Sequence, residues 1–212
     1  MKTKTCTTLL GLLALCFIAV PADVMAFGFG VAGSIGAGDL EISTNSVWEG
    51  GTTTTQYDQD RRSIGLIYDT NVGKDALFNY RLGISYQKMK ADSSESKYDL
   101  DGVAFENDFG FGIIRNETLR FWAGPEVKVE FLEGTESSMG YQYHENLLGV
   151  GIGPVVGVNF HLGNDLSLLV KGGYLFQSDV RLFSDWDERY GFLNIGVIFR
   201  LGGDKAGPVR EN

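Results

Sequence analysis

The sequence predicts an all-β fold, a single eight-stranded antiparallel transmembrane β-barrel, and three observations lead to this prediction. From Phe27 onward, apolar residues recur at every second position, which is the period of a β-strand. The residues between them are often glycine, of which the chain has 29 against only 4 prolines. Short turns and long polar segments alternate between the runs, as they do in barrels that cross an outer membrane.

The N-terminal segment has the features of a secretory signal peptide. Lys2 and Lys4 precede an apolar stretch from Leu9 to Val20, and Ala26 ends a suitable cleavage site. Cleavage there would also remove both cysteines of the chain, so packing and sheet closure must stabilise the mature protein. The expected division is a signal peptide over 1–26, a barrel over 27–201 and a polar tail over 202–212.

Eight alternating runs follow the cleavage site. The first, 27–36, sets apolar residues against glycine, alanine and serine, and the second, 63–69, is interrupted by Ile67 on its polar side. The third, 78–87, alternates most regularly. The other five runs cover 102–113, 119–131, 148–161, 166–177 and 193–201. An even number of strands is typical of a single-chain membrane barrel.

The connections between these runs differ in length in a regular order. Tight turns are expected at 70–75, 116–118 and 163–165, and long loops at 37–61, 90–100, 133–146 and 178–189. Aromatic residues in the long loops are candidates for surface contacts, although local packing would explain them equally well. They are Trp48, Tyr57, Tyr98, Tyr141, Tyr143 and Trp186.

Alternation alone does not decide which face points inward, because a soluble lipocalin-like barrel also has one apolar and one polar face. The small residues on the polar face suit the crowded interior of an eight-stranded barrel. Aromatic residues near the ends of the runs, such as Phe29, Tyr86 and Phe176, are typical of membrane-interface girdles. Both observations favour an apolar outer face, with a soluble periplasmic carrier of apolar ligands as an alternative.

An apolar outer face places a set of charged residues inside the barrel. They are Arg81, Arg120, Lys128, Lys171 and Arg200 together with Asp69, Glu106, Asp108, Glu126 and Glu130. Because an isolated buried ion is costly, these groups are expected to pair and to plug the lumen. The expected role is then structural or one of surface contact, and the alternative is a small gated channel for ions or small solutes.

Charge and motifs argue against several other functions. The formal net charge of -9 disfavours nucleic acid as a partner. His144 and His161, the two histidines, have no sequence context that indicates a catalytic base, so neither an enzyme nor a cofactor is expected. The Asp99-x-Asp101 pair lacks the further ligands of a calcium loop, and no metal site is expected.

Two glycine-rich stretches carry a resemblance to a known superfamily. Trp122-Ala123-Gly124-Pro125-Glu126-Val127 and Gly151-Ile152-Gly153-Pro154-Val155-Val156-Gly157 look like strands of the small bacterial outer-membrane β-barrels, which include the OmpA membrane domain, OmpX, OmpW and the opacity proteins. The resemblance covers most of 27–201 and implies an outer-membrane location.

The resemblance also implies contact with outer-membrane lipid and insertion by the barrel assembly machinery. Members often end in a phenylalanine, whereas here the tail 202–212 follows Phe199 and Leu201. The acidic surface is further expected to bridge lipopolysaccharide through divalent ions. A surface ligand of unknown kind completes the expected partners.

Overall fold

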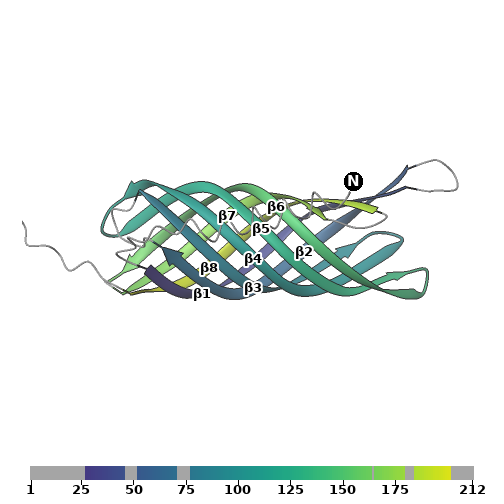
Figure 1. The fold of residues 1–212 in the computed structure, drawn as a ribbon, viewed down its shortest axis with the longest axis horizontal. Helices are drawn as coiled ribbons and strands as arrows, with labels where there is room; N and C mark the ends of the chain where they lie inside the picture. The colour runs from purple at the N-terminus through teal and green to yellow at the C-terminus, as the bar shows by residue number, and fades with distance from the viewer. Residues whose placement is uncertain (1–26, 46–51, 71–76, 164, 180–183, 202–212) are drawn as a thin grey trace, which may run out of the picture.

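The computed structural model describes residues 27–45, 52–70, 77–163, 165–179 and 184–201, which form a closed antiparallel β-barrel (Figure 1). Each strand pairs with the next along the chain, and the last pairs with the first. The strands are β1 (Phe27–Asn45), β2 (Thr52–Thr70), β3 (Phe78–Asp92), β4 (Ser96–Arg115), β5 (Leu119–Ser138), β6 (Tyr141–Leu162), β7 (Leu166–Asp179) and β8 (Ser184–Leu201). This confirms the predicted fold. The expected signal peptide, the C-terminal tail and Trp48 lie outside the described residues.

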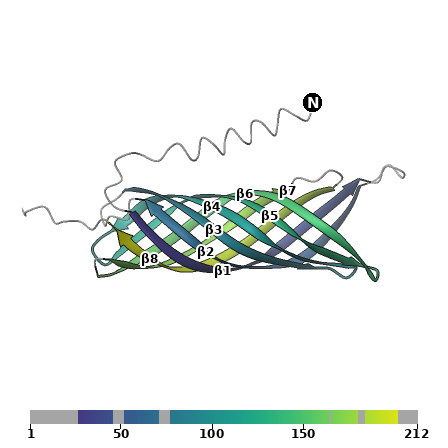
Figure 2. The ribbon, with the colours of Figure 1, turned by 60° about the horizontal axis from the view of Figure 1, so that its bottom comes forward.

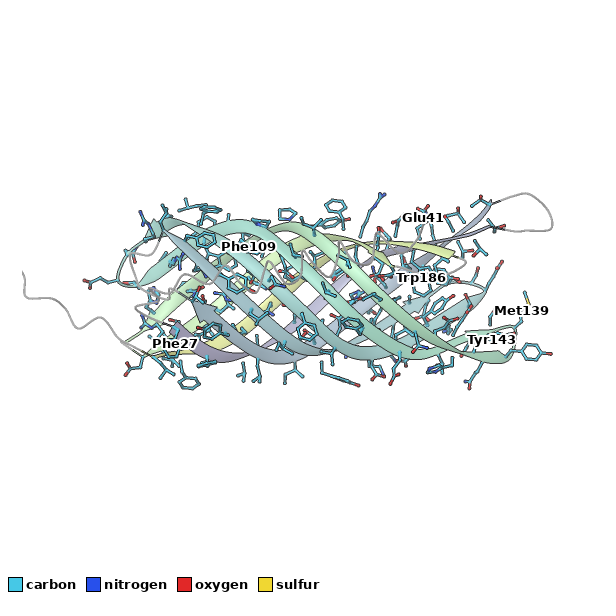
Figure 3. The ribbon with its side chains drawn as sticks, in the orientation of Figure 1. Phe27, Glu41, Phe109, Met139, Tyr143 and Trp186 are labelled. Carbon is cyan, nitrogen blue, oxygen red and sulfur yellow. The ribbon has the colours of Figure 1, made fainter. Side chains whose placement is uncertain are left out.

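The strands run obliquely around a long cylinder, as Figures 1 and 2 show. Phe27 lies at one end of it and Met139 at the other (Figure 3). The end with Met139 carries the long β-hairpins, which in outer-membrane barrels face the outside of the cell, and the opposite end carries the short turns. No helix in the described part of the chain has the length and apolar character needed to cross a membrane.

The prediction of long loops is wrong over most of their length, because the strands continue through them. β1 and β2 pair as far as Asn45 and Thr52, and only Met139 and Gly140 separate β5 from β6. Both residues of this turn have positive φ, 50° and 83°, as a tight two-residue hairpin requires. The segments are rich in threonine and tyrosine, which favour strands. Their alternation was hidden because the outer face above the bilayer is polar.

We call the end of the barrel with the short turns the lower end and the end with the long hairpins the upper end. The outer face is apolar from the lower end to the middle of the barrel. Ile64 is 68% exposed and Leu66 is 66% exposed, and similar residues continue around the barrel. They include Phe29, Val31, Ile35, Ile84, Val103, Phe111, Ile152, Val156, Ile195 and Phe199. The predicted orientation is therefore correct, and it is opposite to the one that a soluble lipocalin-like carrier needs. We call this surface the apolar band.

The small residues of the inner face make room for large side chains that fill the lumen. Trp122 is fully buried inside the barrel, and its indole Nε1 donates a hydrogen bond to Asn159 Oδ1 at 3.1 Å. A Cβ atom at Gly157 would lie 2.4 Å from the Trp122 ring, and one at Gly110 would lie 2.9 Å from it. The two glycines are thus required by the close approach of the indole.

One predicted tight turn is described in full and is confirmed. The Asn116 side chain accepts hydrogen bonds from the backbone N–H groups of Thr118 and Leu119, at 2.9 Å and 2.8 Å. An asparagine that caps its own turn in this way fixes the reversal between β4 and β5 locally.

Candidate functional site

The inside of the barrel contains two apolar clusters with charged residues between them. On β5, which contributes to every layer, the inward side chains run from Trp122 through Glu126, Lys128 and Glu130 to Leu132. The lower apolar cluster consists of Ala32, Ile67, Trp122, Val155, Leu169 and Ile198. The upper apolar cluster consists of Leu40, Ile42, Tyr57, Met89, Ala91, Tyr98, Leu100, Leu132, Leu147 and Trp186.

Lys171 is the centre of what we call the lower ionic cluster. Its ammonium Nζ lies 2.9 Å from Asp108 Oδ2, 2.9 Å from Glu126 Oε2 and 3.4 Å from Glu106 Oε2. Lys171 comes from β7, Glu126 from β5 and the other two carboxylates from β4, so the cluster ties strands that are distant around the ring. One cation thus serves three carboxylates.

Arg81 continues this network toward the turn end of the barrel. Its Nε donates to Asp69 Oδ2 at 3.1 Å, and its Nη1 lies 3.7 Å from Asp108 Oδ2. The guanidinium also lies over the Trp122 ring, 5.0 Å from its centroid, which is a favourable cation–π geometry. Arg120 Nη2 donates to Asn79 Oδ1 at 3.1 Å, and Asn79 in turn donates to Asp69.

Glu130 is the centre of a second group, the upper ionic cluster. Arg61 Nη1 donates to both of its carboxylate oxygens at 2.9 Å, and Lys128 Nζ lies 2.8 Å from Oε2. Arg61 also forms an ion pair with Glu188. Gln177 Nε2 donates to Glu130 Oε1 at 2.7 Å and to Asp179 Oδ1 at 3.1 Å. The cluster therefore contains two cations and three carboxylates, all of them buried.

The structure brings most of the proposed lumen charges together. Arg81, Glu106, Asp108, Arg120, Glu126, Lys128, Glu130 and Lys171 all lie in the two ionic clusters or the network below them. Arg200 lies apart from them, at the turn between β6 and β7, where its Nη2 donates to the backbone carbonyls of Gly163 and Leu166.

Sequence reasoning missed three charged members of the upper ionic cluster. Arg61, Asp179 and Glu188 fell within predicted loops, so no face was assigned to them. A signal was present, because Trp186, Glu188 and Tyr190 alternate with exposed residues and continue the period of β8 toward its start. Extending each alternating run into polar sequence would have placed these residues inside.

Three of the proposed loop-contact residues are not on the surface. Tyr57, Tyr98 and Trp186 lie in strands and point into the barrel, where their rings contact one another with centroids 5.3 Å and 4.9 Å apart. Tyr57 also shares a hydrogen bond of 2.7 Å with Ser96. The prediction that these three make surface contacts is wrong. Their segments are strands above the apolar band, and these three side chains lie on the inner face.

Tyr98 belongs to the upper apolar cluster although it carries a hydroxyl group. Burial, together with the neighbouring Tyr57 and Glu136, raises the pKa of Tyr98 well above its usual range. Tyr98 therefore remains neutral and completes the closed upper apolar cluster. By contrast, Tyr141 and Tyr143 are exposed close to Met139 at the tip of the β5–β6 hairpin (Figure 3).

Little free space remains among the charged side chains. A cavity of about 20 Å³ lies beside Arg61, Lys128 and Tyr190, and another of about 10 Å³ lies beside Arg81 and Lys171. A single water molecule needs about 10–15 Å³ of such space. Each cavity thus has room for about one water molecule.

The two histidines occupy different surroundings. His161 Nδ1 lies 3.1 Å from Ser167 Oγ, and both residues are buried inside the turn end of the barrel. His144 is exposed on the extension of β6. A histidine beside a serine is a possible base and nucleophile, but burial of both closes this pair to a large substrate.

No family model matches the sequence, and a search of curated proteins found no match. Among solved structures, the outer membrane protein OprG from Pseudomonas aeruginosa matches at a TM-score of 0.53, with 11% identity over 84% of this chain and 99% of the other. Ail from Yersinia pestis matches at 0.47, with 12% identity over 83% and 98% of the two chains.

Two further solved structures have lower TM-scores. Neisserial surface protein A matches at 0.44, with 15% identity over 81% of this chain and 96% of the other. The outer membrane protease OmpT from Escherichia coli matches at 0.46, with 6% identity over 84% and 98%. OprG shares the fold, and an apolar band around a closed barrel is stable only where lipid covers it. The chain is therefore a closed eight-stranded β-barrel whose apolar band suits a lipid environment.

Proposed function

We propose that this barrel is closed and that its role in the outer membrane is structural or one of surface contact, with neither transport nor catalysis. The observation that carries the proposal is the paired charge in the lumen. Glu130 accepts from Arg61, Lys128 and Gln177, and Lys171 serves three carboxylates. A passing ion would have to separate these partners, each of which is buried and costly to leave alone.

Packing above and below the charges supports the same proposal. The upper apolar cluster fills the barrel toward the outside, and Trp122 with its neighbours fills it toward the turns. The two cavities between them have room for about one water molecule each. A solute would therefore have to displace both apolar clusters as well as the ions.

Surface contact is supported by the tip of the β5–β6 hairpin. Met139 is 85% exposed, and Tyr141 and Tyr143, which follow it in the hairpin, are also exposed. Figure 3 shows Met139 and Tyr143 at the opposite end of the barrel from Phe27. Large side chains that no other part of the described chain covers are typical of contact surfaces. The partner of this tip would lie outside the cell.

A lipopolysaccharide contact is supported by the outer face just above the apolar band. In the strand register Asp58 of β2 lies between Asp39 of β1 and Asp92 of β3, with Arg189 of β8 on the other side of Asp39, and all four are exposed. Like charges in this position repel each other, and a bound divalent cation removes the repulsion. Such a cation can at the same time bind a lipid phosphate, which is the proposed link to lipopolysaccharide.

Conductance in planar lipid bilayers tests the proposal. We expect the purified barrel to give no discrete current steps, because the ionic clusters and the apolar clusters block the lumen. The alternative, a small gated channel, predicts steps whose size or frequency changes in Glu130→Gln or Lys128→Gln. Steps in the unmodified protein that respond to these substitutions would refute a closed lumen. A lipid A deacylation activity that the unmodified protein has and His161→Ala lacks would refute the absence of catalysis.

A further inference from the structure

The upper ionic cluster has one negative charge more than it has positive charges. Glu130, Asp179 and Glu188 are its carboxylates, and Arg61 and Lys128 are its cations. Each carboxylate side chain is at least nine-tenths buried. An uncompensated charge in such a place is unfavourable, so the cluster as described calls for one further positive charge.

Three buried oxygen atoms in this cluster also have no hydrogen-bond partner among the described residues. They are Asp179 Oδ2, Glu188 Oε1 and Gln177 Oε1. Native proteins satisfy nearly all buried polar atoms, and those that are left point to a group that completes them. Gln177 is uncharged; its Nε2 donates to both Glu130 and Asp179, and its Oε1 is the atom of the amide that has no such partner.

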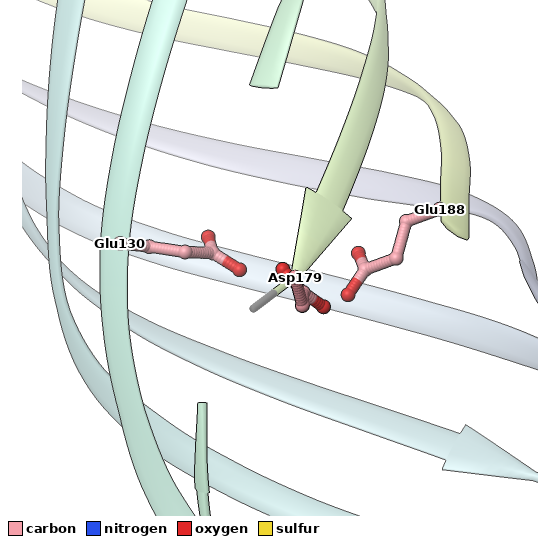
Figure 4. A group of neighbouring side chains, drawn as sticks. All are labelled: Glu130, Asp179 and Glu188. Carbon is pink, nitrogen blue, oxygen red and sulfur yellow. The ribbon is translucent and has the colours of Figure 1, made fainter. Parts of the chain in front are cut away.

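The carboxylates are close enough to share one ion. One oxygen from each of Glu130, Asp179 and Glu188 lies within 4.8 Å of the other two. Figure 4 shows the Asp179 carboxyl group between those of Glu130 and Glu188, which point toward it from opposite sides. Two oxygens bound to one cation at a typical length of 2.3–2.6 Å lie up to about 5 Å apart, so these spacings suit a single ion.

We propose that Glu130, Asp179 and Glu188, assisted by the Gln177 amide oxygen, form a binding site for one small hard cation, Na⁺ or Ca²⁺. Carboxylate and amide oxygens are the ligands that such cations prefer. The cation supplies the missing positive charge and completes the unpartnered oxygens. Asp179 is the last residue of β7, at the hairpin end of the barrel.

Unfolding in urea under ion substitution tests the site. The full-length barrel, refolded in detergent micelles and washed with a chelator, is unfolded in choline chloride, in sodium chloride, or in choline chloride with calcium chloride at the same ionic strength. We expect one of the two cations to raise the midpoint saturably, by about 0.5–1 M urea at ten times its dissociation constant. The salt that raises the midpoint, sodium chloride or calcium chloride, identifies the bound cation.

Variants separate this site from acidic residues on the surface. Asp179→Asn should abolish the response, and Glu188→Gln serves as a second variant if the first does not fold. Asp187→Asn is the matched control, because Asp187 is exposed on the same strand as Glu188 and bonds only Ser178 among the described contacts. It should keep the full response.

Three results would overturn the proposal. The first is an equal midpoint of the unmodified protein in all three salts. The second is a response that survives in both Asp179→Asn and Glu188→Gln, which would place the ion elsewhere. The third is a more stable Asp179→Asn together with no ion response, which would show that Asp179 and Glu188 share a proton. Conductance is measured separately, so an open lumen and an absent cation site are distinguishable.

Discussion

At the scale of single residues, Lys171 is the position where one substitution should cost most. It is the only cation that the described contacts give to Glu126, and it also serves Glu106 and Asp108. In Lys171→Met these buried carboxylates would face one another without their partner. We expect the free energy of unfolding to fall by about 3–5 kcal/mol, measured by urea titration of the barrel in lipid vesicles.

Lys97→Met is the control for this substitution, since Lys97 pairs with Asp92 on the surface and is 72% exposed. Removing an exposed pair should change the free energy of unfolding by about 0.5 kcal/mol or less. Equal losses in the two variants would contradict the expected role of Lys171, and would show that protons neutralise the buried carboxylates.

The residues of the site were predictable only where the alternation was clean. Lys128 and Glu130 alternate with Val129 and Phe131, so their inward orientation follows directly from the period of the strand. Arg61 lies in sequence that is largely polar on both faces. Glu188 lies between the inward Trp186 and Tyr190, but the outer residues there are polar, so no apolar outer face marks the strand. Which cation meets which carboxylate also depends on strand register and tilt, and these are properties of the closed barrel.

At the scale of elements, the β5–β6 hairpin extends well beyond the apolar band. Thr135 and His144 are partners in the strand register, so residues 136–143 can be replaced by Asn-Gly without changing the pairing below them. We expect this shortened protein to fold with an unchanged yield, because the deleted part is mostly exposed. Refolding into detergent, followed by gel mobility, measures the yield.

The same shortening removes Met139, Tyr141 and Tyr143, so it also tests the proposed contact surface. A folded barrel that no longer attaches to a surface bound by the unmodified protein supports a role for the tip. A barrel that fails to fold would contradict the expectation and would show that the hairpin is needed for closure. Asn-Gly inserted in place of Met139-Gly140 alone, with Tyr141 and Tyr143 kept, is the matched control.

The strand boundaries show which parts of the fold the sequence pattern could predict. The eight runs and the short turn at 116–118 were predicted correctly, because a lipid-covered face must be apolar and the turn is capped by Asn116. The upper strand ends were not predicted correctly. Water rather than lipid covers the outer face above the apolar band, so the residues there need not be apolar. There, the local signals were the strand propensities of threonine and tyrosine and the alternation of inward aromatic residues such as Trp186 and Tyr190.

At the scale of the whole molecule, the closed ring of hydrogen bonds should make the barrel resistant to SDS. Every strand has two neighbours, so no edge is left where the detergent can begin to separate them. We expect the protein in the outer-membrane fraction to migrate differently on a gel before and after boiling. A soluble protein with no change in mobility would contradict both the location and the orientation of the faces.

The distribution of the upper ionic cluster around the ring has a consequence for assembly. Glu130 on β5 pairs with Arg61 of β2 and accepts hydrogen bonds from amide groups of β3 and β7, and Arg61 also reaches Glu188 on β8. A half-built barrel would therefore expose unmatched ions to hydrocarbon, and no single hairpin can enter the bilayer on its own at low cost. We therefore expect insertion and ring closure to be one cooperative event, because pairing of the first and last strands completes both the ring and the ionic cluster.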